Sequence, residues 1–379
     1  MQYRKFGSLD FKVSALGFGC MRFPKLDQDP ANIDREEAVK MLHYAIDNGV
    51  NYLDTAYPYH KGESEALVGQ AVKDGYRDRV KLATKLPIWK VENAEDPDKF
   101  LDEQLQKLGV EAVDFYLVHA LNKETWKKVH EFDVFNFLQR AIKEGKIRYA
   151  GFSFHDELEL FKEITDAFPW ALCQIHLNHV DRHYQAGLAG LEYAAQKGLA
   201  VVAMEPLRGG KLVTRVPEDI MQVWERAETK RSPVEWALRW LWDKEGVATV
   251  LSGMSTMGEV QENIRLAGKP LTPVTAEEEA IYDQVKKKYE EKSRVNCTGC
   301  GYCQPCDQKV SIPDVLSIYN DIFMYGASEE FLRMYGRMKE LEMDASLCSR
   351  CGQCLEACPQ QIPVTEILQE AEEYYQGKA

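Results

Sequence analysis

The sequence predicts an α/β protein: a (β/α)8 TIM barrel followed by a small, mainly helical metal-binding domain. Three observations lead to this prediction. Short apolar runs alternate with helix-period stretches through about the first 270 residues, eight of the ten cysteines fall between positions 297 and 358, and prolines at 270 and 273 separate the two regions. The 379 residues also exceed the ~150 residues of a typical single domain.

The predicted barrel strands are the eight apolar runs of the first region. They cover residues 13–18, 50–53, 80–84, 115–118, 147–152, 171–175, 200–204 and 248–251. Helical patterns between them cover residues 35–48, 63–73, 97–108, 134–144, 158–167, 187–197 and 233–242. This alternation predicts a closed barrel over residues 1–270, with its active site at the carboxyl ends of the strands. An open doubly wound sheet is the alternative, but no Gly-x-Gly-x-x-Gly follows the first predicted strand.

The remaining third of the chain divides at the first cysteine. Residues 271–296 are predicted to be a helical connector, since Thr275 and Glu278 form a capping box before a charged helical stretch. Residues 297–379 are predicted to be the second domain, with helical patterns at 312–319, 329–338 and 364–375.

Charge and hydropathy narrow the classes of partner. The net charge of −13 repels nucleic acid and anionic lipid surfaces. No apolar run approaches the ~20 residues of a membrane-spanning helix, and the N-terminus shows no apolar export signal. We therefore expect a cytoplasmic protein with neither a nucleic-acid nor a membrane partner.

The cysteines form two closely spaced groups. The first is Cys297-x2-Cys300-x2-Cys303-x2-Cys306, and the second is Cys348-x2-Cys351-x2-Cys354-x3-Cys358-Pro359. In bacterial two-cluster proteins the fourth cysteine of each such group ligates the other cluster. That rule predicts one cluster held by residues 297, 300, 303 and 358 and a second held by residues 348, 351, 354 and 306. A pair of structural zinc sites is the alternative, although zinc knuckles are usually further apart in sequence.

This region resembles a bacterial ferredoxin module with two 4Fe-4S clusters. The first group departs from the ferredoxin pattern in its last spacer of two residues and in Asp307, which stands where a proline follows in ferredoxins. These departures fall at Cys306 and the residue that follows it. The insert of about 40 residues between the groups predicts an expanded, mostly helical module.

Polar side chains follow three neighbouring strands of the predicted barrel. Asp54 ends the second strand and Tyr59 follows it, Lys85 ends the third strand, and His119 ends the fourth. Side chains at these positions point into the mouth of a barrel, so their convergence favours catalysis. Any one of them alone would more simply be a structural residue.

These residues resemble the motifs of the aldo-keto reductase family over about residues 1–268. The motifs are Asp54-Thr-Ala-x-x-Tyr59, the strand-end Lys85 and His119, the segment 145–153 and the segment 253–263. The resemblance implies a nicotinamide-dependent carbonyl reductase with Tyr59 as proton donor and His119 orienting the carbonyl group. Because a free tyrosine has a pKa near ~10, we expect Lys85, paired with Asp54, to lower the pKa of Tyr59.

The resemblance also implies a set of cofactor-binding residues. Ser153 and Gln174 fit positions that hold the nicotinamide carboxamide, and Met204 replaces the usual stacking aromatic. The pyrophosphate and ribose end resembles the family at Leu207, Gly209, Lys211, Gly253, Ser255, Gln261 and Asn263. Glu259 stands where a basic residue would hold a 2'-phosphate, so we expect a slight preference for NADH over NADPH. The same replacements leave room for a flavin such as FMN.

Three hypotheses join the two halves. In the favoured one, the barrel reduces an aldehyde or ketone with NAD(P)H and the clusters shape or cap its mouth. In the second, the clusters pass electrons between a ferredoxin-like partner and the barrel. Because nicotinamide delivers two electrons at once and each cluster accepts one, this path would need an intermediate carrier such as a flavin. In the third, the barrel is a non-catalytic cofactor sensor, which the complete set of four polar residues disfavours. The histidines His176, His179 and His183 are expected to line the pocket rather than to bind a metal.

Overall fold

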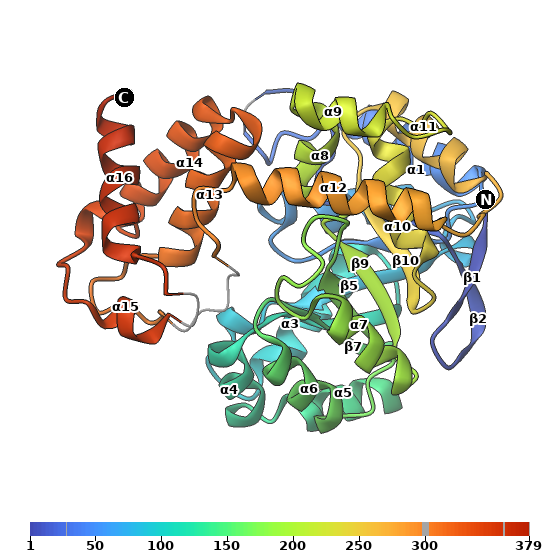
Figure 1. The fold of residues 1–379 in the computed structure, drawn as a ribbon. Coiled ribbons are helices and arrows are strands. Elements are labelled where there is room, and N and C mark those ends of the chain that lie inside the picture. The colour runs from blue at the N-terminus through green and yellow to red at the C-terminus, as the bar shows by residue number, and fades with distance from the viewer. Residues whose placement is uncertain (28, 298–302, 359–360, 379) are drawn as a thin grey trace. The chain divides into compact units, whose positions relative to one another are not determined.

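The chain forms two compact units. The computed structural model describes residues 1–27, 29–297, 303–358 and 361–378 (Figure 1). The first unit consists of Met1–Arg182, Ala186–Leu207 and Val234–Pro273, and the second of His183–Gln185, Arg208–Pro233 and Val274–Ala379. The second unit thus takes in the segment after Leu207 as well as the cysteine region.

The first unit contains a closed parallel barrel, as predicted. Its strands, in spatial order, are β10 (Val247–Gly253), β3 (Leu16–Gly19), β4 (Tyr52–Asp54), β5 (Lys81–Leu86), β6 (Val113–Leu121), β7 (Ile147–Phe154), β8 (Leu172–His176) and β9 (Ala200–Met204). Gly19 pairs with Asp54 across β3 and β4, so these two strands end at the same level. The carboxyl ends of all eight strands therefore open toward one mouth.

Helices follow the strands around the barrel. They are α1 (Arg35–Asp47), α2 (Ser64–Ala71), α3 (Asp96–Leu108), α4 (Lys123–Glu131), α5 (Val134–Lys143), α6 (Leu158–Ala167), α7 (Gly187–Gln196), α10 (Pro233–Asp243) and α11 (Met257–Ala267). Local sequence determines where several of these helices begin and end. The Asp34 side chain caps the start of α1, and Gly109 ends α3 with a left-handed φ of 63°. The helical patterns predicted α1 to α3, α5 to α7 and α10 to within about two residues, but neither α4 nor α11 was predicted.

An antiparallel hairpin precedes the barrel and corrects the first predicted strand. β1 (Tyr3–Phe6) pairs with β2 (Leu9–Ser14), and the apolar run 13–18 divides between β2 and β3. Phe6 of the hairpin stacks near Phe115 and Tyr52, with ring centroids 4.9 Å and 5.9 Å away. The hairpin thus packs against the amino-terminal parts of the strands, and the opposite end remains for the site.

The second unit is helical and has its own hydrophobic core. Its helices are α8 (Lys211–Thr214), α9 (Glu218–Trp224), α12 (Ala276–Lys292), α13 (Ile312–Tyr325), α14 (Ser328–Glu340), α15 (Gln353–Ala357) and α16 (Val364–Gln376). The predicted capping box of Thr275 and Glu278 begins α12. The core gathers Val315 and Leu316 of α13, Phe331 and Tyr335 of α14 and Leu368 of α16. Several cysteines pack against this core, so these cysteines and the helices share one interior.

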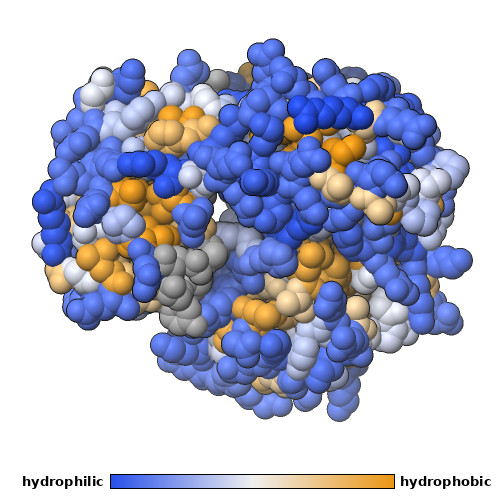
Figure 2. Space-filling model, viewed as in Figure 1, coloured by the Kyte–Doolittle hydropathy of each residue, from blue (hydrophilic) through white to orange (hydrophobic). Residues whose placement is uncertain are grey.

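Figure 2 shows a face that is largely hydrophilic, with hydrophobic residues in separate patches. Among the described residues, no helix has both the length and the apolar character needed to cross a membrane.

Candidate active site and cysteine cavity

A buried ion pair joins the ends of two neighbouring barrel strands. Lys85 of β5 is fully buried, and its Nζ lies 2.6 Å from Asp54 Oδ1 at the end of β4. The same ammonium group donates to the carbonyl oxygen of Thr55 at 2.8 Å. Burial alone would lower the pKa of Lys85, but Asp54 and the Tyr59 hydroxyl outweigh burial and the pKa is raised. Lys85 is therefore a fixed cation at neutral pH.

Tyr59 stands on the other side of this cation. Its hydroxyl oxygen lies 3.4 Å from Lys85 Nζ, which also sits 4.9 Å from the centre of the Tyr59 ring. Burial raises the pKa of Tyr59 above its ordinary value, and the attraction of Lys85 offsets only part of this rise. The prediction of a lowered pKa is therefore wrong in its net direction. The protonated phenol that results is the form a proton donor needs.

His119 completes the group of four predicted residues. It lies on β6, and its ring centroid is 6.0 Å from that of Tyr59 at an interplanar angle of 81°. Trp89, which the sequence analysis did not single out, places its ring 5.1 Å from the His119 ring. Burial, reinforced by the positive charge of Lys85, holds the pKa of His119 well below its usual value. His119 is thus a neutral imidazole, and its buried Nδ1 has no partner among the described residues.

Two of the predicted nicotinamide residues lie side by side on neighbouring strands. Ser153 of β7 pairs in register with Gln174 of β8, and both are buried. Ser153 Oγ accepts a hydrogen bond from the Ala120 amide at 2.7 Å, whereas Gln174 Oε1 is buried without a partner among the described residues. A carboxamide offers both a donor and an acceptor, so this pair fits it. Met204 ends β9, where it pairs in register with His176.

The last strand and α11 carry four further predicted residues. Gly253 ends β10, and an ideal Cβ there would lie 3.0 Å from the Arg22 side chain. The Ser255 amide donates to the carboxylate of Glu259 at 2.7 Å, so an anion already lies at the start of α11. Asn263 is buried and donates to Ser252 Oγ at 2.9 Å, and Gln261 lies exposed on the same helix.

The remaining predicted cofactor residues follow β9. Leu207 closes a segment of the first unit, whereas Gly209 and Lys211 belong to the second unit. Lys211 Nζ pairs with Asp321 of α13 and lies 3.6 Å from Glu330 of α14. Sequence reasoning missed both acidic partners, because nothing local in a helical insert indicates a partner more than 100 residues away.

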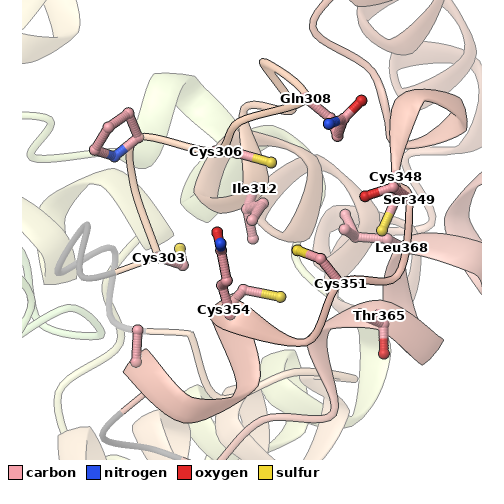
Figure 3. Close-up of a pocket in the computed structure, with 13 residues that line it drawn as sticks. Cys303, Cys306, Gln308, Ile312, Cys348, Ser349, Cys351, Cys354, Thr365 and Leu368 are labelled. Atoms are coloured by element: carbon pink, nitrogen blue, oxygen red, sulfur yellow. The ribbon is translucent and has the colours of Figure 1, made fainter.

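Five cysteines line one cavity in the second unit. The cavity has a volume of about 170 Å³ and is lined by Cys303, Cys306, Cys348, Cys351 and Cys354. In Figure 3 the sulfur atoms of Cys306, Cys351 and Cys354 point toward the same space. The pKa of Cys354 is raised by burial and by three neighbouring thiols, which belong to Cys348, Cys351 and Cys306. The structure thus brings Cys306 to the second cysteine group, as the crossed pairing requires.

The structure describes three of the four cysteines that are predicted to hold the first cluster. Cys300 lies outside the described residues, and Cys297 and Cys358 pack partly buried against the core of the second unit. Cys303 lines the cavity, although the crossed pairing assigns it to the first cluster. Within the described residues, no group of three or more His, Cys, Asp or Glu side chains is arranged to hold one metal ion.

One helix holds the chain just before the first cysteine group. Asn320 of α13 accepts from the Val295 amide at 2.8 Å and donates to the Val295 carbonyl at 2.7 Å. The next residue on α13 is Asp321, which pairs with Lys211. Neighbouring side chains of α13 therefore hold two segments that are distant in sequence.

Comparisons with known proteins agree with this arrangement. Residues 15–284 match the model of the Aldo/keto reductase family, and residues 296–362 match that of the 4Fe-4S dicluster domain. An uncharacterized oxidoreductase of Schizosaccharomyces pombe is 28% identical over 296 residues, which cover 75% of this chain and 92% of that protein. A probable aldo-keto reductase of Glycine max is 26% identical over 69% of this chain and 82% of its own length.

A solved structure of similar fold supports the same assignment. The holo form of an aldo-keto reductase from Bacillus halodurans superposes with a TM-score of 0.64 at 26% identity, covering 75% of this chain and 96% of that one. The family match spans most of the chain, begins just after the hairpin and includes every strand of the barrel. The chain is therefore an oxidoreductase that belongs to the aldo/keto reductase family and carries a carboxyl-terminal 4Fe-4S dicluster domain.

Proposed function

We propose that the protein reduces an aldehyde or ketone to the alcohol with NAD(P)H. The observation that carries this proposal is the position of Lys85 Nζ, which lies 2.6 Å from the Asp54 carboxylate and 3.4 Å from the Tyr59 hydroxyl. A buried cation beside a phenol stabilises the phenolate that forms when the phenol gives up its proton. A small-molecule carbonyl compound is the expected substrate.

Each of the four residues has a distinct task in this mechanism. Tyr59 donates its proton to the carbonyl oxygen, and Lys85 stabilises the negative charge that remains on the Tyr59 oxygen. Asp54 keeps Lys85 charged and oriented. His119, as a neutral imidazole, donates a hydrogen bond that orients the carbonyl group. When bound, the reduced nicotinamide supplies a hydride to the carbonyl carbon.

The proposed nicotinamide site is the pair of strands that carries Ser153 and Gln174. The Ser153 hydroxyl can donate to a carboxamide oxygen, and the partnerless Gln174 Oε1 can accept from its amide. The other proposed cofactor residues are Met204, Leu207, Gly209, Lys211, Gly253, Ser255, Gln261 and Asn263. Since the Glu259 carboxylate lies at the start of α11, we propose that NADH is preferred over NADPH.

The proposed cluster ligands follow the crossed pairing. Cys306, Cys348, Cys351 and Cys354 hold one cluster, which the shared cavity supports. Cys297, Cys300, Cys303 and Cys358 hold the other. When bound, such clusters supply one-electron transfer. In the proposed mechanism the clusters take no part in the reduction of the carbonyl group, since hydride transfer moves both electrons together.

The experiment that tests the mechanism compares two tyrosine variants of the full chain, purified without oxygen. We expect Tyr59→Phe to lose at least about 100-fold in kcat across a panel of aldehydes and ketones, because the acid is removed. Tyr57→Phe removes a hydroxyl from the same segment, one that lies 3.5 Å from Glu103, and should retain activity. Full activity of Tyr59→Phe with unchanged NADH binding would refute the mechanism.

A further inference from the structure

The segment that follows Tyr59 has an unusual backbone. His60 and Lys61 have φ angles of 53° and 54°, and Gly62 has a φ of 98°. Two consecutive residues with side chains in the left-handed region are unfavourable, so contacts elsewhere must hold them there. The segment carries Tyr59 at its start, which makes the source of those contacts relevant to catalysis.

The His60 ring supplies two of these contacts. The ring is buried, with 7% of the residue exposed. Its Nδ1 lies 2.8 Å from the carbonyl oxygen of Pro30, and its Nε2 lies 3.1 Å from the amide of Phe23. A carbonyl oxygen can only accept and an amide can only donate, so Nδ1 carries the proton and Nε2 accepts. The neutral ring fits both partners, and burial accordingly lowers the pKa of His60.

Both partners of His60 lie on the loop between β3 and α1. This loop begins at Cys20, whose amide donates to the Asp54 carbonyl oxygen at 2.8 Å. Further along, Ser255 Oγ donates to the Arg22 carbonyl oxygen at 2.8 Å. The loop is therefore tied to the Asp54 strand end and to a proposed cofactor residue, and His60 fastens the Tyr59 segment to it.

We propose that His60 is a positioning residue: by bonding the loop at Phe23 and Pro30, it holds the Tyr59 hydroxyl at Lys85. The inference rests on the proposed function, since it assigns His60 a role through Tyr59. His60 does not contact the reacting atoms. Its loss should lower kcat while leaving the affinity for NAD(P)H nearly unchanged, because misplacing a reacting group slows the chemical step.

Three variants of the full protein test this proposal. His60→Phe keeps a ring but removes both hydrogen bonds, and we expect kcat to fall by about 10-fold or more. His60→Asn keeps a donor near the Nδ1 position and His60→Gln an acceptor near the Nε2 position, so each should restore part of kcat. Lys61→Ala is the matched control, since it removes only a partly exposed ion pair to Asp29 on the same loop and should keep the wild-type kcat.

One further measurement makes the outcomes distinct. Amide hydrogen exchange at Phe23 should be faster in His60→Phe than in the wild-type protein, because the acceptor of the Phe23 amide is lost. In His60→Gln the exchange rate should stay closer to that of the wild-type protein. This measurement does not depend on activity. If Tyr59→Phe is inactive but a folded His60→Phe keeps kcat within about twofold of wild type, the proposed function stands and the positioning role is refuted. If Tyr59→Phe stays active, both fail. If His60→Phe does not fold, the same criterion applies to His60→Leu, which also removes both hydrogen bonds.

Discussion

Lys85 and Asp54 form an ion pair that is closed to solvent, with the ammonium nitrogen 2.6 Å from the carboxylate and side-chain exposures of 0% and 2%. A buried ion pair contributes little net stability, but removing one partner leaves an uncompensated charge. The pair is therefore better suited to fixing the charge state of Lys85 than to stabilising the fold.

The first prediction concerns this pair. Asp54→Asn should lower the free energy of unfolding by about 3–5 kcal/mol and reduce kcat, because Lys85 loses its charge partner. Denaturant unfolding and steady-state kinetics measure the two effects. Asp114→Asn is the control: Asp114 is equally buried and paired with Arg77 at 2.8 Å, near the start of β6, and should cost stability without lowering the kcat of folded protein. Equal kcat losses in both variants would contradict the assignment.

The second prediction is the pH dependence of kcat. The pKa of His119 lies well below its ordinary 6.5, so no loss of activity with a midpoint near 6.5 is expected from this residue as the pH falls. The pKa of Tyr59 is raised above 10.0, so the acid stays protonated through the neutral range and kcat should fall only at strongly alkaline pH. A kcat profile between pH 5.5 and 10 with the slowest substrate of the panel checks this. An acid limb near 6.5 that disappears in His119→Gln would contradict it.

The third prediction concerns the cysteine cavity. Cys306→Ala should lose about half of the iron and acid-labile sulfide of the anaerobically purified protein, because one of two clusters loses a ligand. Cys173→Ala removes a buried barrel cysteine and should keep the full content. Zinc without sulfide in the wild-type protein would instead support structural zinc sites.

The fourth prediction concerns electron flow. If hydride passes directly to the carbonyl carbon, neither NADH nor NADPH reduces the clusters, whereas dithionite does. Electron paramagnetic resonance after each addition provides the measurement. A reduced-cluster signal with NADH would favour an electron path through the clusters. Flavin analysis would then test for a bound flavin that accepts two electrons from NADH and passes them on one at a time.

The fifth prediction concerns the acidic partners of Lys211. Asp321→Asn should tighten NADH binding by about 3- to 10-fold if Lys211 binds the pyrophosphate, since a competing carboxylate is removed. Glu329→Gln, on the exposed side of the neighbouring helix α14, is the control. Unchanged affinity in Asp321→Asn would show that Lys211 does not serve the cofactor.

Local sequence signals were sufficient for the barrel and for the four central residues. Strand-end positions and helix caps depend on neighbours in sequence, so Asp54, Lys85 and His119 could be placed together. The hairpin is not among the predicted elements, because the prediction assigns the apolar run 13–18 to a single strand. The alternation of Leu9, Phe11 and Val13 nevertheless indicates β2.

Other parts depend on contacts between distant segments. The pKa of Tyr59 follows from how deeply the fold buries it, which spacing alone does not give. His60 was not predicted because its two partners lie 30 and 37 positions earlier in the chain. For the same reason, the ion pair of Lys211 with Asp321 has no local sequence signal.

The placement of Asn320 and Asp321 on α13 has a consequence for maturation of the protein. A helix is stiff over neighbouring residues, so a displacement of Val295 that moves Asn320 also moves Asp321. If a cluster binds at the nearby Cys297, any displacement of Val295 that it causes would be transmitted along α13 to the segment that carries Lys211. The two segments would then adjust together rather than independently, because one rigid helix turn lies between them.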